Sequence, residues 1–428
     1  MGETNKNAIT NEFDPAKVKK LSFKEILKRI GPGIVLTGVV IGPGNITTSA
    51  MIGANYGYDL IWLVIPILIM GVTFMLTSYR ISMLTGMPIL HAIQHYYGKV
   101  ASGFCGVALF LSCLFFTLGN ISGTGAGMNL IFGINWKLGA VIMLCILMVL
   151  YFSKGVYSKV EKGILICIIG MILAFYATLV ATGGPAWGSM GRSLTHWSIP
   201  EGSLTTALAY ISTNAAVTAG IYGTYLGAEK KWKKEDLFNG AMKWDAIAHV
   251  VTVILISGAI ILVGAIVLNP QGIAIKAPAQ LAELLVPFLG KASNYVMGIA
   301  LLGAGFSSLL GNTQRGMVLL NAGFDKDVSL EAKSIRWGCV ATFVFACVIC
   351  FIYGGSPTQL IFIANIATSI ATPVAGLFIT LMFWKKEVQA GLKAPRFLQI
   401  LMTVSYLFTL VMTVFALGNY IPKLIASL

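Results

Sequence analysis

Charged residues are scarce in this sequence. Asp, Glu, Lys and Arg together make up 11% of its 428 residues, whereas 57% of the residues are hydrophobic. A soluble domain is about one quarter charged, and no soluble fold could bury this much apolar surface. The scarcity of charge therefore excludes an ordinary soluble protein and predicts a chain that has lipid as its solvent.

Acidic residues and histidines are the rarest of the reactive groups, with 16 Asp and Glu and 4 His. None of the acids lies near the middle of an apolar run, so the membrane interior has no carboxylate for a proton relay or for acid catalysis. Asp245 and His249 have the spacing of a helical pair at one end of a run. With no nucleophile–base pair and no metal-ligand cluster in the runs, we expect neither an enzyme nor a cofactor.

Long apolar runs dominate the sequence instead. A helix needs about 20 apolar residues to cross a bilayer, whereas a β-barrel would show strands of about 10 residues with alternating polarity. The runs fit helices and exclude a barrel. We predict about eleven spans, near 30–57, 60–84, 102–132, 138–153, 160–182, 203–228, 242–268, 291–322, 335–354, 358–384 and 397–420.

The basic residues indicate how the chain is oriented. All but 5 of the 30 Lys and Arg fall in the N-terminal tail and in alternate loops. These segments are Lys17–Arg29, Arg80–Lys99, Lys154–Lys162, Lys230–Lys243, Arg315–Arg336 and Lys385–Arg396. An excess of Lys and Arg marks the cytoplasmic side. We therefore expect a multi-pass protein of the plasma (inner) membrane with a cytoplasmic N-terminus, and the net charge of +14 needs no nucleic-acid partner.

Two spans contain residues that break helices. The first carries Gly42-Pro43-Gly44-Asn45 near its middle, and the sixth is rich in Asn, Ala, Thr and Gly over 213–223. Broken helices at matching positions in two halves indicate a binding site at the membrane midplane. We predict one membrane domain over 1–428 with inverted five-helix repeats near 30–182 and 203–384 and an extra helix near 397–420.

The break in the first span resembles the Asp-Pro-Gly-Asn motif of the Nramp family of divalent metal transporters. Further stretches resemble that family in the same order: ITTSAMIGANYGYDLIW, YRISMLTGMPILHAIQHYYG, NISGTGAGMNLIFGI, GIALLGAGFSSLLGNTQRG and IATSIATPVAGLF. The resemblance covers residues from about 30 to about 385. It implies an all-α LeuT-type fold of two inverted five-helix repeats plus one helix, and it implies a secondary transporter.

The chain departs from the family pattern at the positions that the family uses for metal ions and protons. The motif's Asp is Gly42 here, although Asn45 remains. The sixth-helix pattern Ala-x-x-Met-Pro-His falls on Ala216, Ala219, Gly220 and Ile221, or on a frame one residue away, and neither frame keeps Met, Pro or His. The acids of the family's third helix fall on Thr117 and Asn120, and the Gln residues of its eighth and tenth helices fall on Phe306 and Ala371.

These departures predict a metal site made of neutral oxygens. The candidate metal-site residues are Gly42, Asn45, Ala216, Thr218, Ala219 and Gly220, and the lost proton-path positions are Thr117, Asn120 and Ile221. Without a thioether the bias against hard cations is relaxed. Small residues at 42 and 219 are expected to widen the pocket for a partly hydrated ion, which suits Mg²⁺ because it gives up water reluctantly.

We therefore expect a carrier of a divalent cation, foremost Mg²⁺ and also Mn²⁺, that works without proton coupling. The chain resembles the Nramp-related magnesium transporters in its altered first-helix and sixth-helix site. Two other hypotheses stay open, a LeuT-fold carrier of a small organic solute and a sensor that does not transport. Divalent flux distinguishes the first hypothesis from both, and binding of a ligand without flux would identify a sensor.

Overall fold

The computed structural model describes residues 14–152, 156–215 and 217–426, and within these ranges every regular element is a helix. The long helices of the first half are α2 (Pro32–Val40), α3 (Pro43–Tyr56), α4 (Val64–Thr85), α5 (Ile89–Phe132), α6 (Trp136–Phe152) and α7 (Val156–Ala181). Those of the second half are α9 (Leu204–Asn214), α10 (Val217–Glu229), α12 (Ala241–Val267), α15 (Ser293–Gly323), α16 (Lys333–Ile352), α17 (Pro357–Ala367) and α18 (Ala371–Trp384). The last long helix is α19 (Arg396–Ala426).

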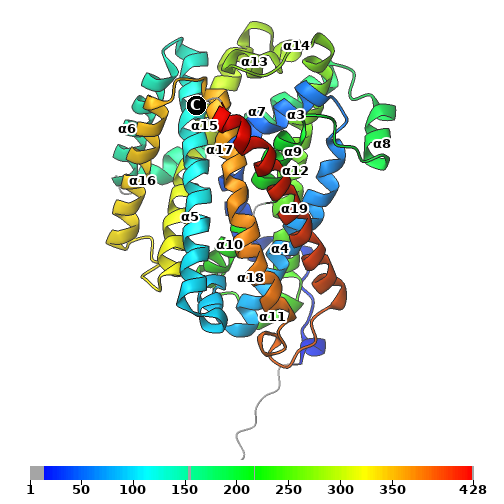
Figure 1. Cartoon of the computed structure of the whole chain (residues 1–428), viewed down its shortest axis with the longest axis vertical. Helices are drawn as coiled ribbons and strands as arrows, with labels where there is room; N and C mark the ends of the chain where they lie inside the picture. Colours follow the sequence, from blue (N-terminus) through cyan, green and yellow to red (C-terminus); the bar gives the residue numbers. More distant parts are fainter. Residues whose placement is uncertain (1–13, 153–155, 216, 427–428) are drawn as a thin grey trace, which may run out of the picture.

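Short helices lie at the two ends of this bundle and, in the case of α8, at its side (Figure 1). They are α1 (Phe23–Arg29), α8 (Trp187–Thr195), α11 (Lys234–Phe238), α13 (Pro278–Glu283) and α14 (Val286–Leu289). In Figure 1, α13 and α14 lie at the top and α11 lies at the bottom. We call the end that carries α1 and α11 the N-terminal face.

The helices follow the predicted spans. Among the described residues, seven helical segments are long and apolar enough to cross a membrane unaided. The remaining predicted spans correspond to the helices α6 and α7 and to two pairs of half-helices, α2 with α3 and α9 with α10. Span one and span six are therefore both interrupted, as the sequence predicted.

The start of α5 differs from the prediction. The sequence placed 85–101 in a loop, but the helix begins at Ile89 and continues through a kink at Gly98, where φ is +88°. Ile89 and Ile93 are fully buried in this first stretch, whereas His95 is exposed. An amphipathic helix on the surface of the bundle has no long apolar run, and for that reason it was mistaken for a loop.

The half-helices lie at the centre of the bundle because small residues let other helices approach them. A Cβ added to Gly53 of α3 would lie 2.1 Å from the carbonyl oxygen of Ile261 in α12. On the facing side, a Cβ added to Gly264 of α12 would lie 3.0 Å from the Ala50 carbonyl oxygen of α3. Small residues at such crossings allow backbone-to-backbone packing in membrane proteins. The polar break before α3 is thereby held inside protein and away from lipid.

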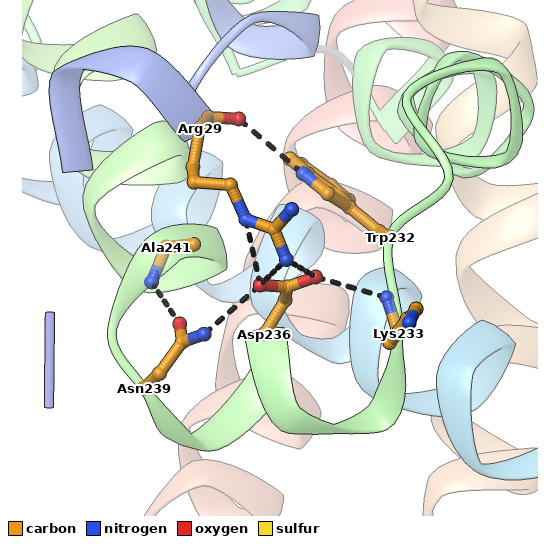
Figure 2. A network of polar contacts seen from close by, with 6 residues as sticks. All are labelled: Arg29, Trp232, Lys233, Asp236, Asn239 and Ala241. Atoms are coloured by element: carbon orange, nitrogen blue, oxygen red, sulfur yellow. Dashed lines mark hydrogen bonds and ion pairs between the residues drawn. The ribbon is translucent and has the colours of Figure 1, made fainter. Parts of the chain in front are cut away.

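The N-terminal segment is fastened to α11 by the polar network in Figure 2. The Arg29 guanidinium donates to both carboxylate oxygens of Asp236, at 3.1 Å from Nε to Oδ1 and 2.7 Å from Nη2 to Oδ2. The same carboxylate accepts from the Lys233 amide and from the Asn239 side chain, both at 2.9 Å. The Trp232 indole donates to the Arg29 carbonyl oxygen at 3.4 Å. This network holds the segment before α2 against the N-terminal face.

Candidate functional site

The break in the first span lies between Val40 and Pro43. Gly42 has an extended backbone, with φ −125° and ψ −179°, and Pro43 begins α3 without an amide donor. Two side chains of α15 form hydrogen bonds to the backbone at the break. Asn312 donates to the Val39 carbonyl at 3.1 Å, and Ser308 donates to the Ile41 carbonyl at 3.2 Å. The carbonyl groups that the broken helix exposes are thus partly satisfied by a neighbouring helix.

The break in the sixth span follows Asn214. Ala215 has φ −109° and ψ 33°, which is outside the helical range, and α10 begins at Val217. Ala216, which the sequence placed in the metal site, lies outside the described residues. Because α9 ends and α10 begins here, a helix C-terminus and a helix N-terminus both lie within the bundle. A helix C-terminus carries partial negative charge that favours cations.

A chain of hydrogen bonds fixes the orientation of Asn45. The carbonyl oxygen of Tyr210 can only accept, so the Asn214 amide nitrogen at 2.7 Å must face it. The Asn214 oxygen is then turned toward Asn45, whose amide nitrogen donates to it at 2.7 Å. The Oδ1 atom of Asn45 remains as an acceptor, buried and without a hydrogen-bond partner among the described residues.

Asn365 of α17 is also fixed by a backbone carbonyl, that of Gly44 in α3. Its amide nitrogen donates to the Gly44 carbonyl at 2.9 Å, and its Oδ1 atom is buried without a partner among the described residues. Ser212 of α9 donates to the Asn365 backbone carbonyl at 2.8 Å. The helices α3, α9 and α17 therefore meet at Asn45, Asn214 and Asn365, which we call the amide cluster.

The amide cluster is a neutral, oxygen-presenting environment. Asn45, Asn214 and Asn365 are all 3% exposed or less. Among the described residues no group of three or more His, Cys, Asp or Glu could hold a metal ion. Amide oxygens are hard ligands of the kind that Mg²⁺, Ca²⁺ and Mn²⁺ accept. Chemically the cluster can orient water or bind a hard cation, but it cannot transfer a proton.

Gly42 does not leave the open space that the sequence suggested. A Cβ at this position would lie 2.7 Å from Asn120 Oδ1 and 2.7 Å from Ser308 Oγ. The expectation that the missing side chain widens the pocket is therefore wrong for this conformation, because Asn120 and Ser308 fill the volume. Asn120 itself is buried, and its Nδ2 atom has no partner among the described residues.

The predicted residues of α10 face different neighbours. The Thr218 hydroxyl is buried without a hydrogen-bond partner in the described part of the chain. Ala219 belongs to the main apolar core. Gly220 faces α4, since a Cβ there would lie 3.0 Å from the Phe74 carbonyl oxygen. Thr218 is thus the one of the three with a free polar group, and the assignment of all three to a metal site stays a prediction.

Thr117 and Ile221, which the sequence assigns to a lost proton path, carry no titratable group. Thr117 donates to the Cys113 carbonyl at 2.9 Å and lies 3.1 Å from the Thr313 hydroxyl, so it is engaged in helix packing. Ile221 is fully buried and apolar. Neither side chain can accept and release a proton at physiological pH.

Asp245 caps the start of α2, and within the described part of the chain it forms no hydrogen bond with His249. Its carboxylate accepts from the backbone amides of Gly31 and Gly33 at 2.9 Å, at the start of α2, and from the Tyr79 hydroxyl at 3.1 Å. His249 instead lies 2.8 Å from the Thr37 hydroxyl. The pairing suggested by the i, i+4 spacing is replaced by capping, because a carboxylate at a helix N-terminus satisfies amides that lack a helical partner.

Asn214 and Asn365 were missed by sequence reasoning. The resemblance to the family's tenth helix places that helix's Gln at Ala371, which begins α18. Asn365 lies about two turns earlier, in α17. The available signal was a single amide within an otherwise apolar stretch, IFIANIA, since a buried amide needs partners. The sequence alone could not identify the Gly44 carbonyl as that partner.

The comparisons with known proteins agree with this architecture. A family model described as natural resistance-associated macrophage protein-like (Nramp) matches residues 33–418. The chain is 23% identical over 377 residues to a protein named divalent metal cation transporter MntH from Caldanaerobacter subterraneus subsp. tengcongensis, covering 86% of this chain and 87% of that protein. A protein of the same name from Agrobacterium fabrum is 26% identical over 391 residues, covering 88% of this chain and 84% of that protein.

Solved structures support the fold. A crystal structure of the Eremococcus coleocola manganese transporter has a TM-score of 0.74 at 14% identity, covering 94% of this chain and 89% of that chain. MhsT in complex with L-phenylalanine has a TM-score of 0.56 at 17% identity, covering 92% of this chain and 99% of that chain. The arrangement is thus the LeuT-type fold that the sequence predicted.

Proposed function

This chain belongs to the natural resistance-associated macrophage protein-like (Nramp) family, and from that premise we propose that it carries a divalent cation across a membrane. Its relatives are named as transporters of divalent metal cations, and it belongs with them and not with an enzyme family. The cation is bound where the half-helices meet, at Asn45 and its neighbours in the amide cluster.

The observation that carries the proposal is the forced orientation of the amides. The Gly44 carbonyl orients Asn365 directly, and the Tyr210 carbonyl orients Asn45 through Asn214. In both cases the amide nitrogen is used as the donor, so the Oδ1 atoms of Asn45 and Asn365 are left as free acceptors. A buried acceptor without a partner costs about 1–3 kcal/mol. A cation bound to these oxygens, or a water molecule that donates to them, offsets that cost, whereas an anion would be repelled by them. The free acceptors therefore favour a cation substrate over an anion.

We further propose that the ion is bound partly hydrated and that Mg²⁺ is preferred, with Mn²⁺ also carried. The amide cluster contributes no negative charge, and a bare divalent ion without compensating charge is very costly to bury. Retained water spreads the charge of the ion and donates hydrogen bonds to the amide oxygens. Mg²⁺ keeps several waters when bound in proteins more readily than its competitors. Loss of the sixth-helix Met removes a soft ligand that would favour Mn²⁺.

Proton coupling is absent in this proposal. The positions that correspond to the family's proton-binding residues are Thr117, Asn120 and Ile221, none of which titrates. The membrane potential then supplies the driving force. The distribution of Lys and Arg supports an N-terminal face that is cytoplasmic and a location in the plasma (inner) membrane.

The test is flux into liposomes that contain the purified protein at a controlled membrane potential, with Mg²⁺ or Mn²⁺ outside and a divalent-sensitive dye inside. Asn45→Ala and Asn365→Ala each remove one free acceptor. We expect the apparent affinity for the cation to fall about tenfold, which corresponds to about 1.4 kcal/mol. Asn129→Ala is the matched control, because Asn129 also makes one amide hydrogen bond, 2.9 Å to the Ile134 carbonyl, but lies at the end of α5.

The outcomes separate the hypotheses. Unchanged affinity in both Asn45→Ala and Asn365→Ala, with normal folding, would contradict the placement of the site. Wild-type liposomes that carry neither cation would contradict the function. In that case, thermal stabilisation by an organic solute that also crosses the membrane would identify an organic carrier, and stabilisation without flux would identify a sensor.

A further inference from the structure

Arg315 is a buried cation without an ionic partner. The sequence pattern places it in a basic loop, but it lies within α15 and is 1% exposed. Its guanidinium donates to Asn312 Oδ1, lies 5.7 Å from the centre of the Phe116 ring and is close to the Cys113 thiol. Its Nε and Nη1 atoms have no hydrogen-bond partner, and no ion pair in the described part of the chain includes it.

Arg315 lies between the helix break and the cytoplasmic side. On one side, its partner Asn312 donates to the Val39 carbonyl at the end of α2. On the other side, Val318, one turn further along α15, lines a pocket of about 350 Å³ together with Tyr222 and Asp327. Tyr222 is within range of the Arg315 charge. The guanidinium therefore occupies the layer of protein between the metal site and the pocket on the N-terminal face.

Packing alone does not account for a charged residue here. Burial of an ion costs several kcal/mol when no counter-charge is present, and a neutral side chain of similar size avoids that cost. Arginine also stays charged at every physiological pH. A fixed positive charge in a narrow, low-dielectric passage repels cations, and it repels a divalent ion twice as strongly as a monovalent one.

We propose that Arg315 is the electrostatic barrier of the cytoplasmic half of the pathway. This inference rests on the proposed function. While α2 is packed against α15, the guanidinium is shielded from water, and its charge prevents a cation from passing from the site into the pocket. When α2 withdraws, the Asn312–Val39 contact breaks, water reaches the guanidinium and screens its charge, and the ion can leave. Arg315 is thus a gating residue that does not bind the ion.

Neutralising the charge should convert saturable transport into a leak. We propose to measure Mg²⁺ and Mn²⁺ entry into liposomes, at fixed inside-negative potential, over a wide range of cation concentration. Arg315→Met should add a component that does not saturate and exceeds the wild-type background at least tenfold. Arg315→Lys keeps the charge but loses the guanidinium geometry, and it should show no such leak.

A second pair of variants leaves Arg315 and its contacts intact. Val318→Glu places a carboxylate one turn away, facing the pocket, and should neutralise the barrier and produce the same leak. Val318→Gln is the matched control with the same shape and no charge, and it should behave as the wild type. This pair keeps the test decisive even if Arg315→Met does not fold.

The results distinguish the barrier from the function. If the wild type carries divalent cations and neither Arg315→Met nor Val318→Glu leaks, the barrier is contradicted and the transport function stands. If Arg315→Lys leaks as much as Arg315→Met, the role is geometric and the electrostatic barrier is likewise contradicted. Absence of divalent flux in the wild type would contradict both proposals together.

Discussion

Gly44 is so close to Asn365 that no larger residue fits without displacing the amide. A Cβ at Gly44 would lie 2.6 Å from Asn365 Oδ1, whereas a Cβ at Gly38 in α2 would meet only Ser307 Oγ, at 3.8 Å. We predict that Gly44→Ala lowers the apparent affinity for the cation and destabilises the protein by about 1–3 kcal/mol, as overpacking does. Gly38→Ala is the control and should change neither.

Thermal unfolding in detergent and cation uptake in liposomes measure the two effects. A Gly44→Ala protein with wild-type affinity would mean that the position of the Asn365 amide is irrelevant to the bound ion.

Restoring the family's Asp at position 42 requires a second change. Asn120 Oδ1 and Ser308 Oγ lie where the new side chain must begin. We predict that Gly42→Asp alone is destabilised or inactive, and that adding Asn120→Ala recovers folding and shifts preference from Mg²⁺ toward Mn²⁺, because a carboxylate supplies the charge that dehydrated ions need. Competition between the two ions in the uptake assay measures the shift. Equal preference in the folded double variant would argue that Gly42 is remote from the ion.

The residues of the site were only partly predictable. Asn45 follows from its motif, since the Gly42–Pro43–Gly44 break makes any neighbouring polar group conspicuous. Asn365 does not follow, because its role depends on a hydrogen bond to the Gly44 carbonyl, 321 residues away in sequence. The filling of the Gly42 space by Asn120 and Ser308 is also a contact between distant helices. Tertiary partners of this kind leave no periodic signal in the sequence.

At the scale of elements, the spans were predictable because lipid imposes one rule on all of them. A run of about 20 apolar residues must be helical to satisfy its backbone. Two features were not predicted by this rule. The helix over 89–97 is amphipathic and short, and Arg315 lies inside α15 although its charge suggested a loop. Neither segment faces lipid, because the first is a surface helix with one buried face and Arg315 is enclosed by protein, so their composition does not indicate where the membrane begins.

The attachment of α11 to the N-terminal segment should depend on Asp236. We predict that Asp236→Asn weakens this attachment by about 2 kcal/mol, since hydrogen bonds to charged groups contribute about 1.5–3 kcal/mol. Trypsin cleavage after the lysines and arginine of α1 should then become faster. Glu235→Gln is the matched control, because Glu235 is an exposed acid in the same helix turn. Equal cleavage rates in the two variants would refute the role of the network.

The same network should fail in acid. Burial of Asp236 opposes its ionisation, but hydrogen bonds from the Lys233 amide, Asn239 and Arg29 hold the pKa of its carboxyl below the ordinary value. A lowered pKa stabilises the folded state fully above the ordinary Asp pKa of about 3.9, and the contribution is lost as the pH falls through the lower folded value. Hydrogen exchange of residues 20–31 should therefore stay slow, after correction for intrinsic rates, down to about pH 4 and lose protection below it. Protection that Asp236→Asn and the wild type lose identically would contradict this assignment.

At the scale of the whole molecule, the two halves place their broken helices in opposite directions. The chain reaches α3 from the N-terminal face and reaches α10 from the opposite end of the bundle, through α9 (Figure 1). The C-terminus of one half-helix and the N-terminus of another thus meet in the interior. This explains how a cluster of amides that contains no carboxylate can still present an ordered set of polar groups to an ion.

The thermodynamic signature of the proposed cycle is a steady state set by membrane potential alone. Each charge gains about 2.3 kcal/mol per 100 mV. A divalent ion carried without protons should therefore accumulate about 100-fold per 60 mV of inside-negative potential, since 1.4 kcal/mol corresponds to a factor of ten. We predict this plateau in liposomes with a potassium diffusion potential and equal pH on both sides, and no accumulation when the potential is zero. An imposed difference of one pH unit should leave the plateau unchanged, whereas symport with one proton would shift it about tenfold. A shift of that size would overturn proton-independence and leave divalent transport standing, because the cation would still accumulate, with a proton as its partner.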